Sequence, residues 1–185
     1  MKNYKIFFPL LFFLIVFSGL NAQVTNTSYI TTYQEKVLQI TTIVPAERAE
    51  VWKLFTTDSG LIKWIAPVAT INMKIGGWIR TNYDEKASTD DVTAIQLDII
   101  NYLENEMLIL KVNLNDNFPE EAIKEDKNLQ EIIQFIDMGN GTTKIISSMV
   151  GWGKGSYWDK TYSFFEKGNE WTYKEFMKIF STSNQ

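Results

Sequence analysis

The chain has 185 residues, a formal net charge of −4, and neither cysteine nor histidine. The missing residue types exclude a Ser-His or Cys-His nucleophile pair, a thiolate or imidazole metal ligand and a disulfide, so the core alone must stabilise the fold. The acidic balance also disfavours nucleic acid as a partner, because a duplex binder needs a basic patch that displaces counterions.

Residues 1–22 predict a cleaved export signal. Lys2 and Lys5 flank the start of an apolar run of about 12 residues, whereas a membrane-spanning helix needs about 20. Small and polar residues follow, which favours cleavage after Ala22. The alternative is an uncleaved anchor, and the early end of the apolar run argues against it. Cleavage lowers the net charge to −6, and we expect an exported chain, periplasmic or secreted, with no transmembrane segment.

The next part of the chain predicts a strand followed by two short helices. Residues 23–34 form a polar N-terminal segment, and the alternation of apolar residues over Lys36–Val44 predicts the first strand. Pro45 fits the first turn of a helix over residues 46–55, and Asp58 is placed to cap a second short helix.

Period-two alternation from residue 68 onward predicts an antiparallel meander. Its strands are expected over residues 68–75, 78–84, 92–101 and 107–114. A charged stretch over 116–127 predicts a short solvated helix instead of an acidic binding site. Two further strands, over 129–138 and 142–150, are joined by the tight-turn sequence Gly139-Asn140-Gly141.

A long C-terminal helix is predicted from Ser156 onward. Ser156 and Asp159 have the spacing of a capping box, and apolar residues then recur at three- and four-residue steps. Ten aromatic residues lie between Trp152 and Phe180, so this helix must bury a broad stripe against the sheet. Without internal repeats or a linker, residues 35–180 indicate one α+β domain, followed by a polar tail over 181–185.

Several short motifs occur in a characteristic order along the chain. They are Val44-Pro45-Ala46, Val51-Trp52, Trp64 with Pro67, Gly76-Gly77-Trp78, Gly151-Trp152-Gly153, Trp158-Asp159 and Tyr162-Ser163-Phe164-Phe165. Together they resemble the START/SRPBCC superfamily, and within it the branch similar to the homologue of the heat-shock chaperone ATPase activator. The resemblance covers residues 35–180 and implies the Bet v 1-like helix-grip fold, a curved antiparallel sheet with two short helices after its first strand and a long C-terminal helix.

The resemblance further implies a deep apolar cavity between sheet and helix that binds a small hydrophobic molecule. Strand alternation and helix periodicity then give the residues expected to line it. These candidate binding residues are Ile79, Thr81, Tyr83, Leu97, Leu110, Phe135, Ser147, Met149, Trp158, Tyr162, Phe165 and Gly168. Gly168 costs a helix about 1 kcal/mol relative to alanine, and its missing side chain leaves room for a ligand. Plain core packing is the alternative for each apolar member.

Three functions stay open at this stage. Binding, with no cofactor and no metal ion, is the leading hypothesis. Some superfamily members are cyclases or hydrolases, and an enzyme of that kind would here have to use Arg80, Tyr83 and Asp84, although a tyrosine with a pKa of about 10 needs activation to act near neutrality. The branch name also suggests a co-chaperone, which fits poorly because that chaperone is cytosolic and this chain carries a predicted export signal.

Overall fold

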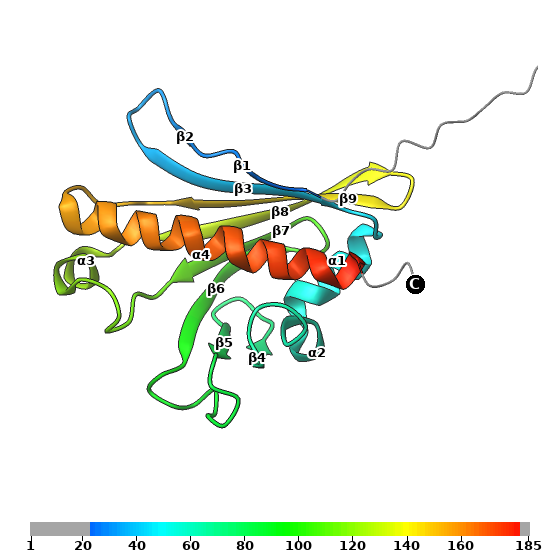
Figure 1. The fold of residues 1–185 in the computed structure, drawn as a ribbon, viewed down its shortest axis with the longest axis horizontal. Helices are drawn as coiled ribbons and strands as arrows, with labels where there is room; N and C mark the ends of the chain where they lie inside the picture. The colour runs from blue at the N-terminus through cyan, green and yellow to red at the C-terminus, as the bar shows by residue number, and fades with distance from the viewer. Residues whose placement is uncertain (1–22, 182–185) are drawn as a thin grey trace, which may run out of the picture.

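The computed structural model describes residues 23–181 (Figure 1). Residues 1–22 and 182–185 lie outside the described residues, so the export signal stays a prediction. Figure 1 shows a single antiparallel sheet, with the long helix α4 (Ser156–Ser181) lying along it. The predicted α+β helix-grip arrangement is therefore confirmed.

Within residues 23–181, nine strands form one antiparallel sheet. Its order is β1 (Val24–Asn26), β3 (Lys36–Val44), β9 (Thr142–Val150), β8 (Gln130–Gly139), β7 (Met107–Val112), β6 (Ile95–Leu103), β5 (Trp78–Asn82) and β4 (Val68–Asn72), and β2 (Tyr29–Ile30) also pairs with β3. The tight turn between β8 and β9 forms as predicted, because Gly139, Asn140 and Gly141 all adopt positive φ angles of 55–74°.

The strands differ from the prediction mainly at their ends. The segment expected to be merely polar contains β1 and β2, which pair with β3 through backbone hydrogen bonds that need no apolar pattern. The third strand of the meander begins at Ile95 instead of residue 92, and Val92 is fully exposed in the preceding loop. Local alternation continues past the last paired residue, which is why it overestimates strand length.

In the described part of the chain, three short helices complete the fold: α1 (Arg48–Thr56), α2 (Asp58–Leu61) and α3 (Glu120–Glu125). The expected cap of α2 was wrong by one residue, because the Thr57 hydroxyl accepts the hydrogen bond from the Gly60 amide at 3.0 Å. Asp58 Oδ1 instead accepts from the Ile71 amide at 2.7 Å and ties α2 to β4.

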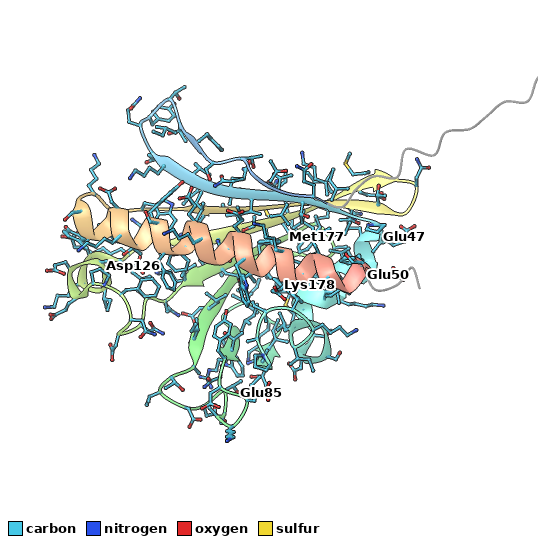
Figure 2. All side chains as sticks on the ribbon, viewed as in Figure 1. Glu47, Glu50, Glu85, Asp126, Met177 and Lys178 are labelled. Atoms are coloured by element: carbon cyan, nitrogen blue, oxygen red, sulfur yellow. The ribbon has the colours of Figure 1, made fainter. Side chains whose placement is uncertain are left out.

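Helix α4 is held to the sheet near both of its ends. Near its start, the Lys36 ammonium on β3 donates to Asp159 at 2.6 Å, so this carboxylate pairs across elements instead of completing the expected capping box. Near its end, the Thr42 hydroxyl on β3 donates to the Met177 sulfur at 2.9 Å, and Figure 2 labels Met177 on this helix. None of the helices among residues 23–181 has the length and apolar character needed to cross a membrane.

The buried core consists of two separate clusters. One lies under the C-terminal half of α4, where Phe55, Trp64 and Phe176 meet with ring centroids 4.6–5.3 Å apart. The other lies under the N-terminal half, where Trp158 packs with neighbours such as Leu38 and Met149. The two clusters therefore lie under opposite halves of α4.

Candidate functional site

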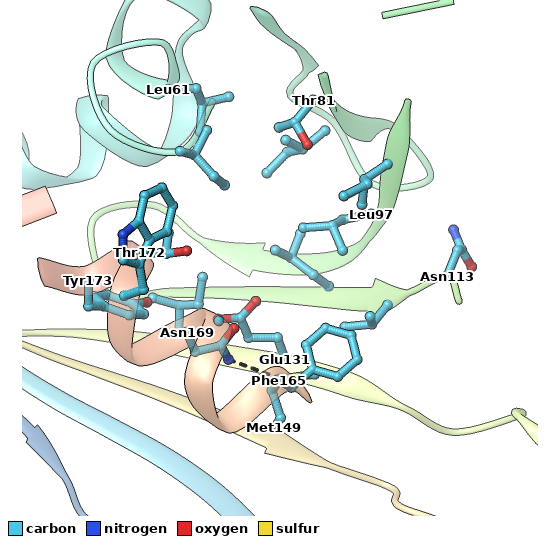
Figure 3. A pocket seen from close by; sticks show the side chains of 18 of the residues that line it. Leu61, Thr81, Leu97, Asn113, Glu131, Met149, Phe165, Asn169, Thr172 and Tyr173 are labelled. Atoms are coloured by element: carbon cyan, nitrogen blue, oxygen red, sulfur yellow. Dashed lines mark hydrogen bonds between the residues drawn. The ribbon is translucent and has the colours of Figure 1, made fainter. Parts of the chain in front are cut away.

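A cavity of about 340 Å³ lies between the sheet and the middle of α4 (Figure 3). Its walls come from α1, α2 and the segment after it, β5 to β9, the loop after β7, and α4. The lining residues are Phe55, Leu61, Trp64, Ile65, Ile79, Thr81, Tyr83, Ile95, Leu97, Leu108, Leu110, Val112, Asn113, Asn115, Asn117, Phe118, Glu131, Ile133, Met149, Phe164, Phe165, Gly168, Asn169, Trp171, Thr172 and Tyr173.

The cavity exists because the two core clusters hold α4 away from the sheet between them. Phe55 and Trp64 of the first cluster and Met149 of the second form parts of its wall. Gly168 lies near the middle of the helix, and a Cβ atom there would meet no atom within 4 Å beyond its chain neighbours and its own helix backbone. A larger residue at this position would project into the cavity, so the glycine helps keep it open.

The structure brings eight of the twelve candidate binding residues together in the cavity wall. They are Ile79, Thr81, Tyr83, Leu97, Leu110, Met149, Phe165 and Gly168. Alternation in β5, β6, β7 and β9 therefore identified the correct face of each strand. Whether these residues bind a ligand stays a prediction.

The other four candidates lie in the surrounding core instead of the cavity wall. Phe135 packs edge-on against Trp52 at 5.3 Å, within the C-terminal cluster. Trp158 and Tyr162 both contact Trp152 at the N-terminal end of α4. These aromatic residues share a face with the lining residues but lie beyond the two ends of the gap. Periodicity cannot separate the two groups, because it identifies a face and not a distance along it.

Ser147, the last of the four, lies behind a side chain that the sequence analysis missed. Its hydroxyl donates a 2.6 Å hydrogen bond to Oε1 of Glu131 on β8, and the Ser147 residue is 1% exposed. Glu131 lines the cavity. Burial raises the pKa of this carboxyl, and the hydrogen bond from Ser147 acts in the opposite direction. The cavity wall thus contains one carboxyl among residues that are mostly apolar.

The same alternation that selected Phe135 also places Glu131 on the inner face of β8, two residues before the buried Ile133. A carboxylate two residues before an inward-facing isoleucine was therefore a signal in the sequence. Glu131 was not predicted to line the cavity, because charged side chains of an alternating strand are normally expected on its solvent-facing side.

Tyr173 supplies a second polar group beside Glu131. The residue is 3% exposed, and its hydroxyl has no hydrogen-bond partner among the described residues. Burial raises the pKa of Tyr173 well above its ordinary value, and the negative charge of Glu131 raises it further. The nearby Ser147 hydroxyl acts in the opposite direction, but its proton is donated to Glu131, and by hydrogen-bond geometry Tyr173 has no partner within residues 23–181. Nearby, the Asn169 amide donates to the Met149 sulfur at 3.1 Å (Figure 3).

The cluster suggested for an enzyme does not assemble. Tyr83 lines the cavity, but Arg80 and Asp84 do not. The Arg80 guanidinium donates to Asp90 and Gln96 at 2.8 Å and lies over the Trp78 ring. Burial raises the pKa of Tyr83, so the phenolate that a general base requires is formed even less at neutral pH.

Aromatic side chains surround the edge of the cavity. Phe118, in the loop after β7, stacks on Phe165 with ring centroids 5.2 Å apart and meets Phe164 edge-on at 5.0 Å. Phe164 and Trp171 on α4 are 59% and 52% exposed although both also line the cavity. These half-exposed rings mark the side from which the cavity reaches solvent.

A family model for proteins described as Activator of Hsp90 ATPase homolog 1-like (AHSA1) matches residues 45–181. The chain belongs to this family. It is therefore an AHSA1-like domain of the SRPBCC superfamily, as the motifs predicted. All the cavity-lining residues of this AHSA1-like domain lie within the matched range. No curated protein matches the chain.

Several solved structures share the fold of this AHSA1-like domain. Protein Ms6760 from Mycobacterium smegmatis has a TM-score of 0.63 at 13% identity, covering 88% of this chain and 100% of that one. Protein MLL2253 from Mesorhizobium loti has a TM-score of 0.62 at 11% identity, covering 80% and 99%. The Aha1 dimer from Colwellia psychrerythraea has a TM-score of 0.61 at 12% identity, covering 80% and 98%. At these identities the likeness shows the fold and nothing more.

Proposed function

We propose that this protein binds a small, largely apolar molecule in the cavity under α4. The observation that carries the proposal is the cavity itself, whose volume of about 340 Å³ lies at the lower end of the range of small-molecule sites. Its walls are mostly aliphatic and aromatic, with a few polar groups that can orient a ligand. Gly168 supports the proposal, because an ordinary side chain at this position would occupy the space.

Burial of apolar surface supplies the affinity. A ligand that buries about 200 Å² of apolar surface gains roughly 5 kcal/mol at 25 cal/mol per Å², before the cost of ordering ligand and protein. The aromatic rings of Phe55, Trp64 and Phe165 in the wall provide much of the surface for this contact. A gain of roughly 5 kcal/mol corresponds to a Kd of about 0.2 mM, so tighter binding requires a larger buried surface or hydrogen bonds to the polar groups of the wall.

The pKa values of the two cavity tyrosines favour binding over catalysis. The pKa values of Tyr83 and Tyr173 are both raised by burial, so neither phenol is activated as a base or nucleophile. A chaperone interaction rests on the family description alone, and fold-level likeness does not carry an activity from one member to another.

Native mass spectrometry of the protein purified from the organism that makes it tests the proposal. We expect a bound molecule that adds its mass to the folded protein and is lost on denaturation. Titration with a broad panel of lipids, polyketides and aromatic compounds provides an independent measurement. If the purified protein carries nothing and no compound of the panel binds, the proposal is overturned.

We also propose that residues 1–22 are removed on export, as their composition predicts. N-terminal sequencing of the protein from the envelope or medium should then begin at Gln23. A cytoplasmic product that retains Met1 would contradict this part of the proposal.

A further inference from the structure

We infer that Glu131, supported by Ser147 and Tyr173, recognises a hydroxyl group on the apolar ligand. This inference rests on the proposed function and adds the chemical class of the ligand. It stands on three observations: the position of a carboxyl in the cavity wall, the absence of a cation beside it, and an unpaired phenol next to it.

The Glu131 carboxyl has hydrogen-bonding capacity that the protein does not use. Ser147 donates to Oε1, and it is the one donor to this carboxyl among residues 23–181. None of the residues that line the cavity is a lysine or arginine, so no cation balances Glu131 there. Buried carboxylates are normally paired or fully hydrogen-bonded. Oε2 can therefore accept a hydrogen bond from a ligand.

Among residues 23–181, the Tyr173 hydroxyl lacks a hydrogen-bond partner, as the second oxygen of Glu131 does. Its hydroxyl is buried beside Glu131 with no partner of its own in the described part of the chain. Leaving a buried donor unpaired is unfavourable, and folded proteins rarely do so. In Figure 3 the Tyr173 ring extends from α4 toward the side of the cavity on which Glu131 lies. Tyr173 and Glu131 both line the cavity, so a ligand that contacts the carboxyl lies beside this side chain.

The free acceptor of Glu131 and the unpaired hydroxyl of Tyr173 determine which polar group of a ligand fits best. A carboxylate or phosphate meets the negative charge of Glu131 with no cation to offset it. A ketone accepts from Tyr173 but has no proton for an ionised Glu131. An ammonium group donates to Glu131 and to the Tyr173 oxygen, but it leaves the Tyr173 proton without an acceptor. A hydroxyl group donates to Glu131 and accepts from Tyr173. The site therefore fits an apolar alcohol or phenol better than a fatty acid.

Three matched probes test this inference: biphenyl, 4-phenylphenol and biphenyl-4-carboxylate. Calorimetric or fluorescence titration of the purified protein should show that 4-phenylphenol binds about tenfold more tightly than biphenyl, as expected for a hydrogen bond to a charged acceptor. The carboxylate should bind more weakly than biphenyl, because it meets Glu131 without a cation.

Two conservative variants separate recognition from folding. Glu131→Gln keeps the shape of the side chain and should reduce the preference for the phenol to about threefold while improving binding of the carboxylate. Tyr173→Phe removes only the unpaired hydroxyl and should lower the preference while biphenyl binds as before. Tyr102→Phe is the matched control, because it removes a hydroxyl from a partly buried tyrosine outside the cavity wall and should change no preference.

The outcomes distinguish this inference from the proposed function. If biphenyl binds and the phenol shows no advantage, or if neither Glu131→Gln nor Tyr173→Phe changes that advantage, the inference is overturned and the apolar binding function stands. If the carboxylate binds most tightly, the assigned ligand class is wrong. If no probe and no compound of the broad panel binds, both proposals are overturned.

Discussion

The Ser147 hydroxyl on β9 donates a 2.6 Å hydrogen bond to Glu131 on the neighbouring strand β8. In the β8–β9 ladder Glu131 lies opposite Met149 and Ser147 lies opposite Ile133, so the bond runs diagonally across the sheet surface. Ser147 is thereby hidden from the cavity, and the carboxyl takes its place in the wall. This relationship gives the mostly apolar wall its one carboxyl group.

Glu131→Gln should remove a pH dependence of stability. Burial raises the folded-state pKa of Glu131 above its ordinary value of 4.5, although the Ser147 hydrogen bond offsets part of the shift. As the pH rises above 4.5 toward the native pKa, the folded state holds more protons than the unfolded state, so the free energy of unfolding falls. Below 4.5 both states are protonated, and above the native pKa the loss is constant.

Urea unfolding of wild type and variant between about pH 4 and pH 8 measures this effect. The stability of Glu131→Gln relative to wild type should increase as the pH rises. Glu104→Gln, at an exposed position, is the matched control for the loss of one negative charge. A difference between Glu131→Gln and wild type that is flat across the range would contradict the prediction.

Gly168→Leu should close the cavity without harming the fold. A leucine is better in a helix than glycine by about 0.5–1 kcal/mol, and the space around this position is free. We expect the free energy of unfolding to stay level or rise, while biphenyl binds at least about tenfold more weakly. Lys167→Leu adds the same side chain at an exposed position of α4 and should leave binding unchanged. Unaltered binding by Gly168→Leu would show that ligands do not enter here.

Phe176→Ala should destabilise the protein far more than Phe164→Ala, although both residues lie on α4. Phe176 is completely buried and contacts Phe55 and Trp64, so its removal should cost about 3–5 kcal/mol. Phe164 is 59% exposed, and its removal should cost about 1 kcal/mol or less. Denaturant midpoints of the two variants measure the difference. Equal losses would mean that the C-terminal cluster does not anchor the helix.

Asp126→Ala should destabilise the loop that leads into β8. The Asp126 carboxylate is 6% exposed, accepts from the Lys111 ammonium at 2.6 Å, and accepts from the Leu129 amide at 3.0 Å. Its loss leaves a partly buried cation and an uncapped amide, which should cost about 2 kcal/mol.

The matched control for Asp126 is an exposed pair on α3. Glu120 and Lys124 form an ion pair with side chains that are 77% and 70% exposed. Glu120→Ala should change the free energy of unfolding by less than about 0.5 kcal/mol, because solvent screens such pairs. Thermal or urea unfolding compares the two variants, and a similar small loss for both would show that the Lys111–Asp126 pair is not structural.

The sequence by itself determined the fold class, the order of the elements and the family. Lys36–Val44 and residues 142–150 were predicted as strands with the bounds that the structure shows, because one face of each strand packs into the core and alternation records that face. The aromatic stripe after Trp152 required a long helix covering a sheet. These properties depend on local periodicity and composition, and both follow directly from the order of residues along the chain.

Only the tertiary structure decided where the packing is complete and where a gap remains. Phe135 and Leu110 face the same side of neighbouring strands, yet Phe135 packs against Trp52 while Leu110 borders the cavity. The difference depends on how closely α4 approaches the sheet, which the two core clusters set at its ends and Gly168 permits at its middle. It also depends on a hydrogen bond between strands that puts Glu131, and not Ser147, in the wall. Distances between layers arise from contacts far apart in the sequence, so no local pattern contains them.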